Sequence, residues 1–145
     1  MRFFWQKKMA EDGTGVPAHL ESGLWGEEMA EKFLKKKGYR ILGRRVRVGR
    51  RDEIDLVARA GEVLVFVEVK TRRDEEFGRP VSAVDREKQR ALSRAAIHYL
   101  KALRFPKINF RIDVIEVVGA PGSASAPMIR HLEAAFPLDR RYRVP

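Results

Sequence analysis

Two hydrophobic stretches of this 145-residue chain carry charged side chains that could perform chemistry. In residues 64–70, side chains alternate between two faces, and both faces are apolar until Glu68 and Lys70. A strand that is apolar on both faces is typical of the middle of an α/β sheet, where an unpaired charge is costly. We therefore expect Glu68 and Lys70 to be compensated by each other or by a metal ion.

The stretch just before it supplies a second carboxylate, Asp55. Strict alternation divides this predicted strand into two faces, with Glu53, Asp55 and Val57 on one and Ile54, Leu56 and Ala58 on the other. A turn signal at residues 59–62 predicts a hairpin that brings Asp55 close to Glu68. Two carboxylates on neighbouring strands are hard oxygen ligands of the kind that Mg²⁺ or Mn²⁺ prefers.

Lys70 would have a separate role in such a site. An amine beside a metal can orient or deprotonate an attacking water and can stabilise charge on a phosphoryl oxygen. The alternative is that Asp55, Glu68 and Lys70 form surface cross-strand ion pairs, each worth less than about 1 kcal/mol. The apolar residues on both faces argue against a solvated strand, and from the residues alone both interpretations stay open.

The chain is strongly basic and contains no cysteine. Its 30 Lys and Arg against 20 Asp and Glu give a net charge of +10 and a pI near 10.3. Such a surface attracts polyanions, so nucleic acid is the leading class of partner, although many small proteins are basic without binding it. No basic amphipathic helix or lipidation motif indicates a membrane. The lack of cysteine excludes disulfides and thiolate metal sites.

The length fits a single domain with short extensions. Residues 1–21 contain Gly and Pro without periodicity and predict a poorly ordered arm, residues 22–136 the folded domain, and residues 137–145 a basic tail. The opening segment is too short and too soon charged for a signal peptide, and no apolar run reaches membrane-spanning length. We expect a cytoplasmic protein.

A first helix is predicted over residues 22–37, ending before Gly38. Its solvated face is expected to carry Glu28, Glu31, Lys32 and Lys35, with Glu28 paired to Lys32 one turn later. Glu27 shares the apolar stripe and should point inward or along the edge of the core. Either it is functional, or it is there because the helix dipole stabilises a first-turn carboxylate.

Basic residues flank the expected acidic site. Arginines alternate with valine after the first helix, and the candidates are Arg44, Arg45, Arg47 and Arg50. They form either a solvated edge strand or a strip that follows phosphates. A second helix is predicted over residues 85–103, and Lys88 at its start either extends to solvent or contacts phosphate.

Two further strands are predicted at residues 111–118 and 128–132. The order helix, three strands, helix, strand, with these acidic motifs, resembles the PD-(D/E)XK nuclease superfamily and, within it, the small bacterial YraN-type proteins. The matching motifs are Gly26-Glu27-x-x-Ala30, Gly38-Tyr39-x-Ile41-Leu42, Glu53-Ile54-Asp55-Leu56, Val65-Phe66-Val67-Glu68-Val69-Lys70-x-Arg72, Phe77-Gly78, Ala83-Val84, Lys88 and Asp113-Val114. Their order and spacing together are more specific than any one of them.

The resemblance implies that Glu27, Asp55, Glu68 and Lys70 form the active site, with archaeal Holliday junction resolvases as architectural relatives. The chain departs from the family pattern at Asp52, where the family has Gly, and at Arg45 and Ala134, where it has Asn. Asp52 adds a carboxylate that could alter metal occupancy, and the missing Asn residues put any backbone capping they provide in doubt.

We therefore expect an α/β fold with a restriction-endonuclease-like core, a central mixed sheet flanked by helices in α-β-β-β-α-β order. The expected function is Mg²⁺- or Mn²⁺-dependent endonuclease cleavage of nucleic acid, with DNA, including branched DNA, favoured over RNA. Asp55 and Glu68 would hold the metal, Lys70 would position water or stabilise charge, and Glu27 would be an outer ligand. The expected nucleic-acid contacts are Arg44, Arg45, Arg47, Arg50, Arg72 and Lys88.

Two other functions are weighed against this one. A nucleic-acid-binding accessory protein without cleavage is the main alternative, because a fold can keep its site geometry and lose turnover. A structural protein that contacts an acidic partner is the third, and it leaves Asp55 and Glu68 without a role. The chain could also form a homodimer, as many junction-cutting enzymes do.

Overall fold

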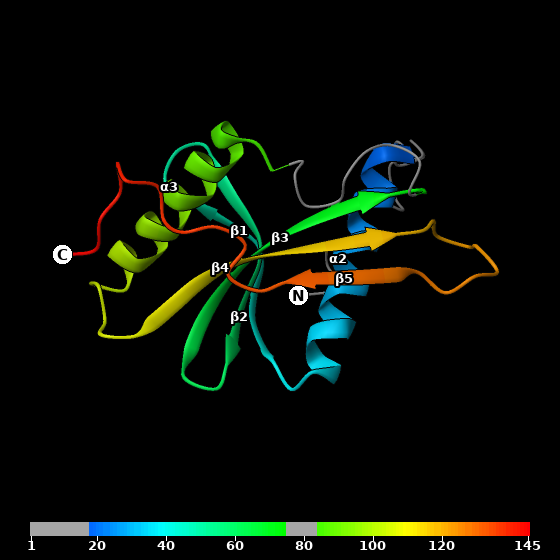
Figure 1. The fold of residues 1–145 in the computed structure, drawn as a ribbon, viewed down its shortest axis with the longest axis horizontal. Helices are drawn as coiled ribbons and strands as arrows, with labels where there is room; N and C mark the ends of the chain where they lie inside the picture. Colours follow the sequence, from blue (N-terminus) through cyan, green and yellow to red (C-terminus); the bar gives the residue numbers. More distant parts are fainter. Residues whose placement is uncertain (1–17, 75–83) are drawn as a thin grey trace, which may run out of the picture.

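A mixed five-stranded sheet with helices on both faces forms the protein in a computed structural model that describes residues 18–74 and 84–145 (Figure 1). The elements are α2 (Ala18–Lys36), β1 (Arg40–Val48), β2 (Asp52–Ala60), β3 (Val63–Arg72), α3 (Arg86–Ala102), β4 (Asn109–Val118) and β5 (Met128–Leu132). The strands lie in the order β1-β2-β3-β4-β5, antiparallel except for β3 and β4. A parallel pair needs a long crossover, which α3 provides. The predicted α/β class is confirmed, and it is compatible with a nuclease-like core.

The central strand β3 separates two hydrophobic cores. Leu64 and Phe66 pack on the side of α3, whereas Val65 and Val67 pack on the side of α2. Both faces of this stretch are therefore buried, as the sequence predicted. Glu68 continues the face of Phe66 and is buried as well, so its carboxylate lies at the end of the apolar run.

A glycine allows α2 to lie close to β3. A Cβ added at Gly26 would collide with the Thr71 side chain, so only glycine permits this approach. The next residue of the helix, Glu27, is thereby brought to the edge of the sheet. The helix begins at Ala18 rather than at the predicted Ser22, so the expected arm overlaps it, and residues 1–17 lie outside the described residues.

The C-terminal segment contacts the domain instead of leaving it at once. Leu138 packs against the α3-side core, and the Asp139 backbone N–H donates a hydrogen bond of 3.0 Å to the Ser93 hydroxyl. The motif residues Phe77, Gly78 and Ala83 lie outside the described residues. Among the described helices, none is long and apolar enough to cross a membrane.

Candidate active site

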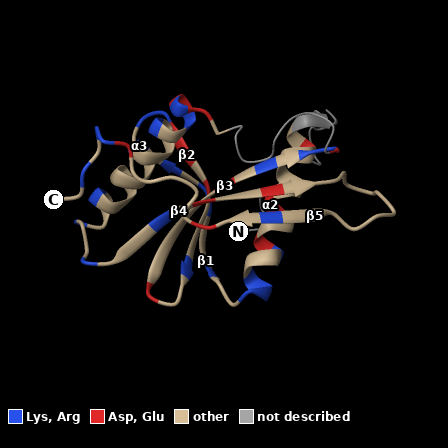
Figure 2. Cartoon of the chain, in the orientation of Figure 1, with Lys and Arg blue, Asp and Glu red and all other residues tan. Residues whose placement is uncertain are grey.

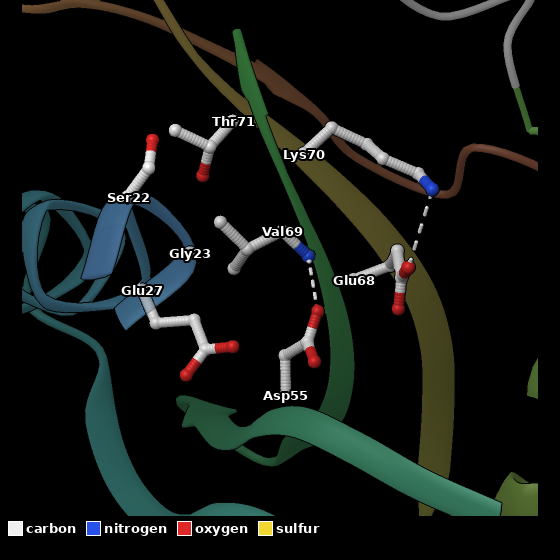
Figure 3. A pocket seen from close by; sticks show the side chains of 8 residues that line it. All are labelled: Ser22, Gly23, Glu27, Asp55, Glu68, Val69, Lys70 and Thr71. Carbon is white, nitrogen blue, oxygen red and sulfur yellow. Dashed lines mark hydrogen bonds and ion pairs between the residues drawn. The ribbon is translucent and has the colours of Figure 1, made fainter. Parts of the chain in front are cut away.

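Four residues singled out from the sequence meet in one pocket, where α2, β2 and β3 come together (Figure 3). The pocket has a volume of about 380 Å³. It is lined by Ser22, Gly23 and Glu27 from α2, Asp55 from β2, and Glu68, Val69, Lys70 and Thr71 from β3. The structure thus assembles Glu27, Asp55, Glu68 and Lys70 from three elements.

Asp55 reaches the pocket where β2 separates from β3. Residue pairing between the two strands ends at Leu56 and Val67. One residue further, the Asp55 carboxylate accepts a hydrogen bond of 2.8 Å from the backbone N–H of Val69. The prediction of strict alternation is wrong here, because Ile54 packs in the α3-side core and Leu56 in the α2-side core. The irregularity falls at Asp55 itself, where a side-chain acceptor takes the place of a strand partner.

The carboxylates of the pocket are only partly neutralised by their surroundings. Desolvation and the nearby Glu68 carboxylate raise the pKa of Asp55 to about 8, while the Val69 N–H acts in the opposite direction. The pKa of Glu27 is also raised, because desolvation outweighs the opposite effect of the Arg45 guanidinium. Perturbed carboxylates in a pocket are candidates for a functional site, because a bound ligand can compensate their burial.

Glu68 is almost fully buried, and the two lysines that pair with it among the described residues both approach the same oxygen. Oε1 lies 3.6 Å from Lys70 Nζ and 3.2 Å from Lys88 Nζ. Oε2 is buried and accepts no hydrogen bond from a donor within residues 18–74 and 84–145, although the Asp55 carboxyl lies within hydrogen-bond reach of Glu68. Burial without a partner costs free energy, so this oxygen is a candidate position for a bound cation or water. The amine of Lys88, which was expected to reach solvent or phosphate, instead contacts Glu68.

The donor set suits a hard divalent cation. Asp55 and Glu68 present carboxylate oxygens, and within the described part of the chain no donor bonds Glu68 Oε2. Within residues 18–74 and 84–145, no three His, Cys, Asp or Glu side chains lie close enough to hold a metal ion. Asp55 and Glu68 therefore fit a cation as two protein ligands. Mg²⁺ is commonly held in this way, with water and phosphate oxygens completing its coordination.

The arginines expected to form one strip point in different directions. The four are Arg44, Arg45, Arg47 and Arg50. Arg44 and Arg45 turn toward α2, where they pair with Glu31 and Glu27. Arg47 is 90% exposed, and Arg50 lies exposed in the turn after β1. Arg44 stays 49% exposed while it pairs, so of these four arginines only Arg45 is largely withdrawn from solvent.

A row of alternating charges crosses the sheet beside the pocket (Figure 2). The strand register places Lys70 of β3, Glu116 of β4 and Arg130 of β5 next to one another. Arg72, a predicted nucleic-acid contact, has its Nε 3.5 Å from Glu116 Oε1, and the Glu116 side chain is 2% exposed. The row gives the α3 side of these strands several cations held around one buried carboxylate.

Two other carboxylates have roles different from those expected. Asp52 accepts two hydrogen bonds from Arg94 of α3, at 2.7 and 2.8 Å, which lower its pKa, and it does not line the pocket. Glu31 was predicted to be solvated, yet it is only 3% exposed, because β1 and its arginine cover it. Glu28, in contrast, pairs with Lys32 at 3.7 Å as predicted.

Some residues of the site carried no recognisable signal. Ser22 and Gly23 line the pocket from the first turns of α2, where small residues are common in any helix. Thr71 follows Lys70 directly, so its position on the strand was the one available clue. Arg130 lies in a strand of five residues, too short for its pattern to indicate a role.

Comparison with known proteins shows the family. Residues 26–117 match the model of the "Uncharacterised protein family UPF0102". This range includes Glu27, Asp55, Glu68 and Lys70. A UPF0102 protein of Syntrophomonas wolfei is 46% identical over 118 residues, 80% of this chain and 97% of the relative. One of Symbiobacterium thermophilum is 48% identical over 114 residues, 79% of this chain and 94% of the relative. One of Geobacter sulfurreducens is 44% identical over 126 residues, which are 87% of this chain and 96% of the relative. The chain therefore belongs to the UPF0102 family, the YraN-like group that its motifs resemble.

Proposed function

We propose that this UPF0102 protein is a metal-dependent endonuclease with a PD-(D/E)XK type of active site. The proposal depends above all on Glu68, a buried carboxylate whose Oε1 faces two amines and whose Oε2 accepts no hydrogen bond from a donor of the described residues. Beside it, burial and the Glu68 charge raise the pKa of Asp55 to about 8. Carboxylates held in this state destabilise the fold, so a ligand that compensates them is expected.

Each side chain of the pocket has a role in this proposal. Asp55 and Glu68 would hold Mg²⁺ or Mn²⁺, and Glu27 would act as an outer ligand. The metal, when bound, would supply positive charge to phosphoryl oxygens and lower the pKa of water. Lys70, whose amine lies 3.6 Å from Glu68, would position the attacking water or stabilise charge on the phosphate.

Nucleic acid is the substrate class that the charge of the chain favours. A net charge of +10 attracts polyanions. Of the predicted phosphate contacts, Arg44, Arg47 and Arg50 are exposed and remain candidates, whereas Arg45, Arg72 and Lys88 already pair with Glu27, Glu116 and Glu68. DNA, including branched DNA, is favoured over RNA. The protein would act in the cytoplasm, and a homodimer would place two such sites on one branched substrate.

Salt dependence tests the nucleic-acid interface. Log affinity should fall linearly with log salt concentration, because each phosphate contact releases counterions. Arg47→Gln should make that slope shallower by about one unit on duplex DNA. Arg59→Gln is the matched control, since Arg59 lies near the β2–β3 turn and bonds the Gly61 carbonyl. An affinity that does not change with salt would count against the interface.

Calorimetry with Mn²⁺ tests the metal site directly. Asp55→Asn combined with Glu68→Gln should abolish Mn²⁺ binding, because both proposed ligands lose their charge. Nucleic-acid affinity should stay the same or rise, since two negative charges are removed from beside the phosphates. Glu53→Gln, which changes an exposed carboxylate of the same strand β2, should bind Mn²⁺ like the parent. Unchanged binding in the double variant would overturn the site assignment.

Cleavage decides between the enzyme and its main alternative. The purified chain should be incubated with branched, duplex and single-stranded DNA and RNA, with Mg²⁺ or Mn²⁺ and with chelator. We expect metal-dependent cleavage of at least one substrate. Binding without cleavage would favour a catalytically silent accessory protein, an outcome consistent with two lysines already neutralising Glu68 Oε1.

A further inference from the structure

The Glu27 carboxylate is held by a planar cation. Arg45 Nε donates to Glu27 Oε2 at 2.8 Å, and Arg45 Nη2 donates to Oε1 at 3.2 Å. The two side chains are 28% and 17% exposed, so the pair is largely withdrawn from solvent. Paired hydrogen bonds between a guanidinium and a carboxylate are among the stronger polar contacts in proteins. Both carboxylate oxygens that face the pocket from α2 are thus engaged.

The backbone of β1 adopts an unfavourable conformation at this contact. Arg45 has a φ of +45°, in the left-handed region that residues with a long side chain seldom occupy. Consecutive residues of a strand normally point to opposite faces, yet Arg44 and Arg45 both pair with carboxylates of α2. The left-handed conformation of Arg45 lets both arginines point toward α2. The strain of this conformation accompanies the contact between the Arg45 guanidinium and Glu27.

We propose that Arg45 is a positioning residue that competes with the divalent metal for Glu27. This inference rests on the proposed function, in which Asp55 and Glu68 bind the metal. Glu27 lines the same pocket as Asp55 and Glu68. Among the described residues these side chains are not close enough to hold a cation together, so Glu27 would have to leave Arg45 and rotate toward the cation to serve as a ligand. A guanidinium that holds both oxygens of a carboxylate repels a divalent cation and competes with it for those oxygens. Arg45 therefore keeps Glu27 out of the metal site and weakens metal binding.

A double-mutant cycle on the full-length chain tests this competition, with Mn²⁺ affinity measured by calorimetry. Arg45→Asn should tighten Mn²⁺ binding by about tenfold, because Glu27 becomes available as a ligand. Asn is chosen because it tolerates the left-handed conformation better than other non-glycine residues, so the variant should fold. In a Glu27→Gln background, the same Arg45→Asn change should alter the affinity by less than about twofold.

A matched control separates this effect from the loss of one positive charge. Arg40→Asn removes an exposed arginine of the same strand β1 and should leave Mn²⁺ affinity within about twofold of the parent. A gain from Arg45→Asn that is as large in the Glu27→Gln background would overturn the proposal, as would no gain at all. If neither the parent nor any variant binds Mn²⁺, the proposed metal site fails with it. Binding that is equal in the parent and in Arg45→Asn refutes only the role of Arg45.

Discussion

Two buried carboxylates on adjacent strands, Asp113 and Glu68, differ in how many hydrogen-bond donors surround them. Asp113 of β4 is fully buried and accepts hydrogen bonds from both Nε and Nη2 of Arg111, at 2.9 and 3.2 Å. His131 Nε2 lies 2.7 Å from its Oδ2, and the Ala134 N–H donates at 2.9 Å. Glu68 of β3 is 4% exposed, yet no donor among the described residues bonds its Oε2.

The pKa values follow the same division. Burial raises the pKa of Asp113, but the hydrogen bonds from His131, Arg111 and Ala134 outweigh it, and the net shift is downward. Burial and a like charge raise the pKa of Asp55, and the single N–H bond does not offset them. A carboxylate that holds the fold together is surrounded by donors, whereas the carboxylates of the pocket are left short of them. The contrast separates a carboxylate whose hydrogen bonds hold the fold together from the carboxylates for which we propose a metal ligand.

Removing the structural acid should have the largest effect. Asp113→Ala leaves buried hydrogen-bond donors and the Arg111 charge without their acceptor, so the free energy of unfolding should fall by about 3–5 kcal/mol. Urea denaturation measures this change. Glu133→Gln, in the same network but 51% exposed, is the control and should cost less than about 1 kcal/mol. A loss below about 1 kcal/mol in Asp113→Ala would remove the basis of the comparison.

Lys70→Met should separate activity from stability at the other acidic group. The variant keeps the aliphatic stem but loses the charge proposed to assist water attack, so cleavage should drop by about two orders of magnitude or more. The free energy of unfolding should stay within about 1 kcal/mol of the parent or rise, because a half-buried amine is removed. Mn²⁺ should still bind. Cleavage at the parental rate would make Lys70 an ion-pair residue and the proposed mechanism wrong.

Asp55→Asn should stabilise the metal-free protein, the reverse of the Asp113 result. Because its folded pKa is raised to about 8, Asp55 contributes stability that is present below its unfolded pKa of about 3.9 and is lost as pH rises to about 8. The free energy of unfolding of the variant should therefore exceed that of the parent by an amount that grows as pH rises, to about one to a few kcal/mol. The amide oxygen of the variant side chain can still accept the hydrogen bond from the Val69 N–H. Urea denaturation in chelator between about pH 5 and about pH 8 tests this.

The pH dependence of Asp113 should have the opposite sign. Its folded pKa is lowered, so its contribution is present above the unfolded pKa of about 3.9 and is lost as pH falls through the folded value. Parallel pH profiles for Asp55 and Asp113 variants would contradict the division between the two kinds of acid.

The smallest effect on the free energy of unfolding is expected at an exposed ion pair. Glu28 and Lys32 lie 3.7 Å apart on the solvated face of α2, with side chains 42% and 57% exposed. Glu28→Gln should change the free energy of unfolding by less than about 0.5 kcal/mol, since water already solvates both charges. Thermal denaturation at low and high salt checks it, and a loss comparable to that of Asp113→Ala would mean that burial does not set the scale.

Several features were determined by the sequence alone. The apolar residues on both faces of β3 predicted a buried central strand and drew attention to Glu68 and Lys70. The turn before β3 predicted the hairpin that brings Asp55 beside Glu68. These inferences succeeded because strand alternation and short turns act between residues close in sequence, where the local pattern carries the information.

Only the tertiary structure decided which charges neutralise which. Arg45 on Glu27, Lys88 on Glu68 and Arg94 on Asp52 join residues that are far apart in the chain. Alternation placed Arg45 on a solvated strip, and the family motif placed Asp52 beside the site. Instead, a left-handed backbone conformation turns Arg45 to Glu27, and Asp52 pairs with Arg94 of α3 and does not line the pocket. The state of a buried carboxylate depends on every donor packed around it, and packing brings those donors from elements whose positions the local sequence does not encode.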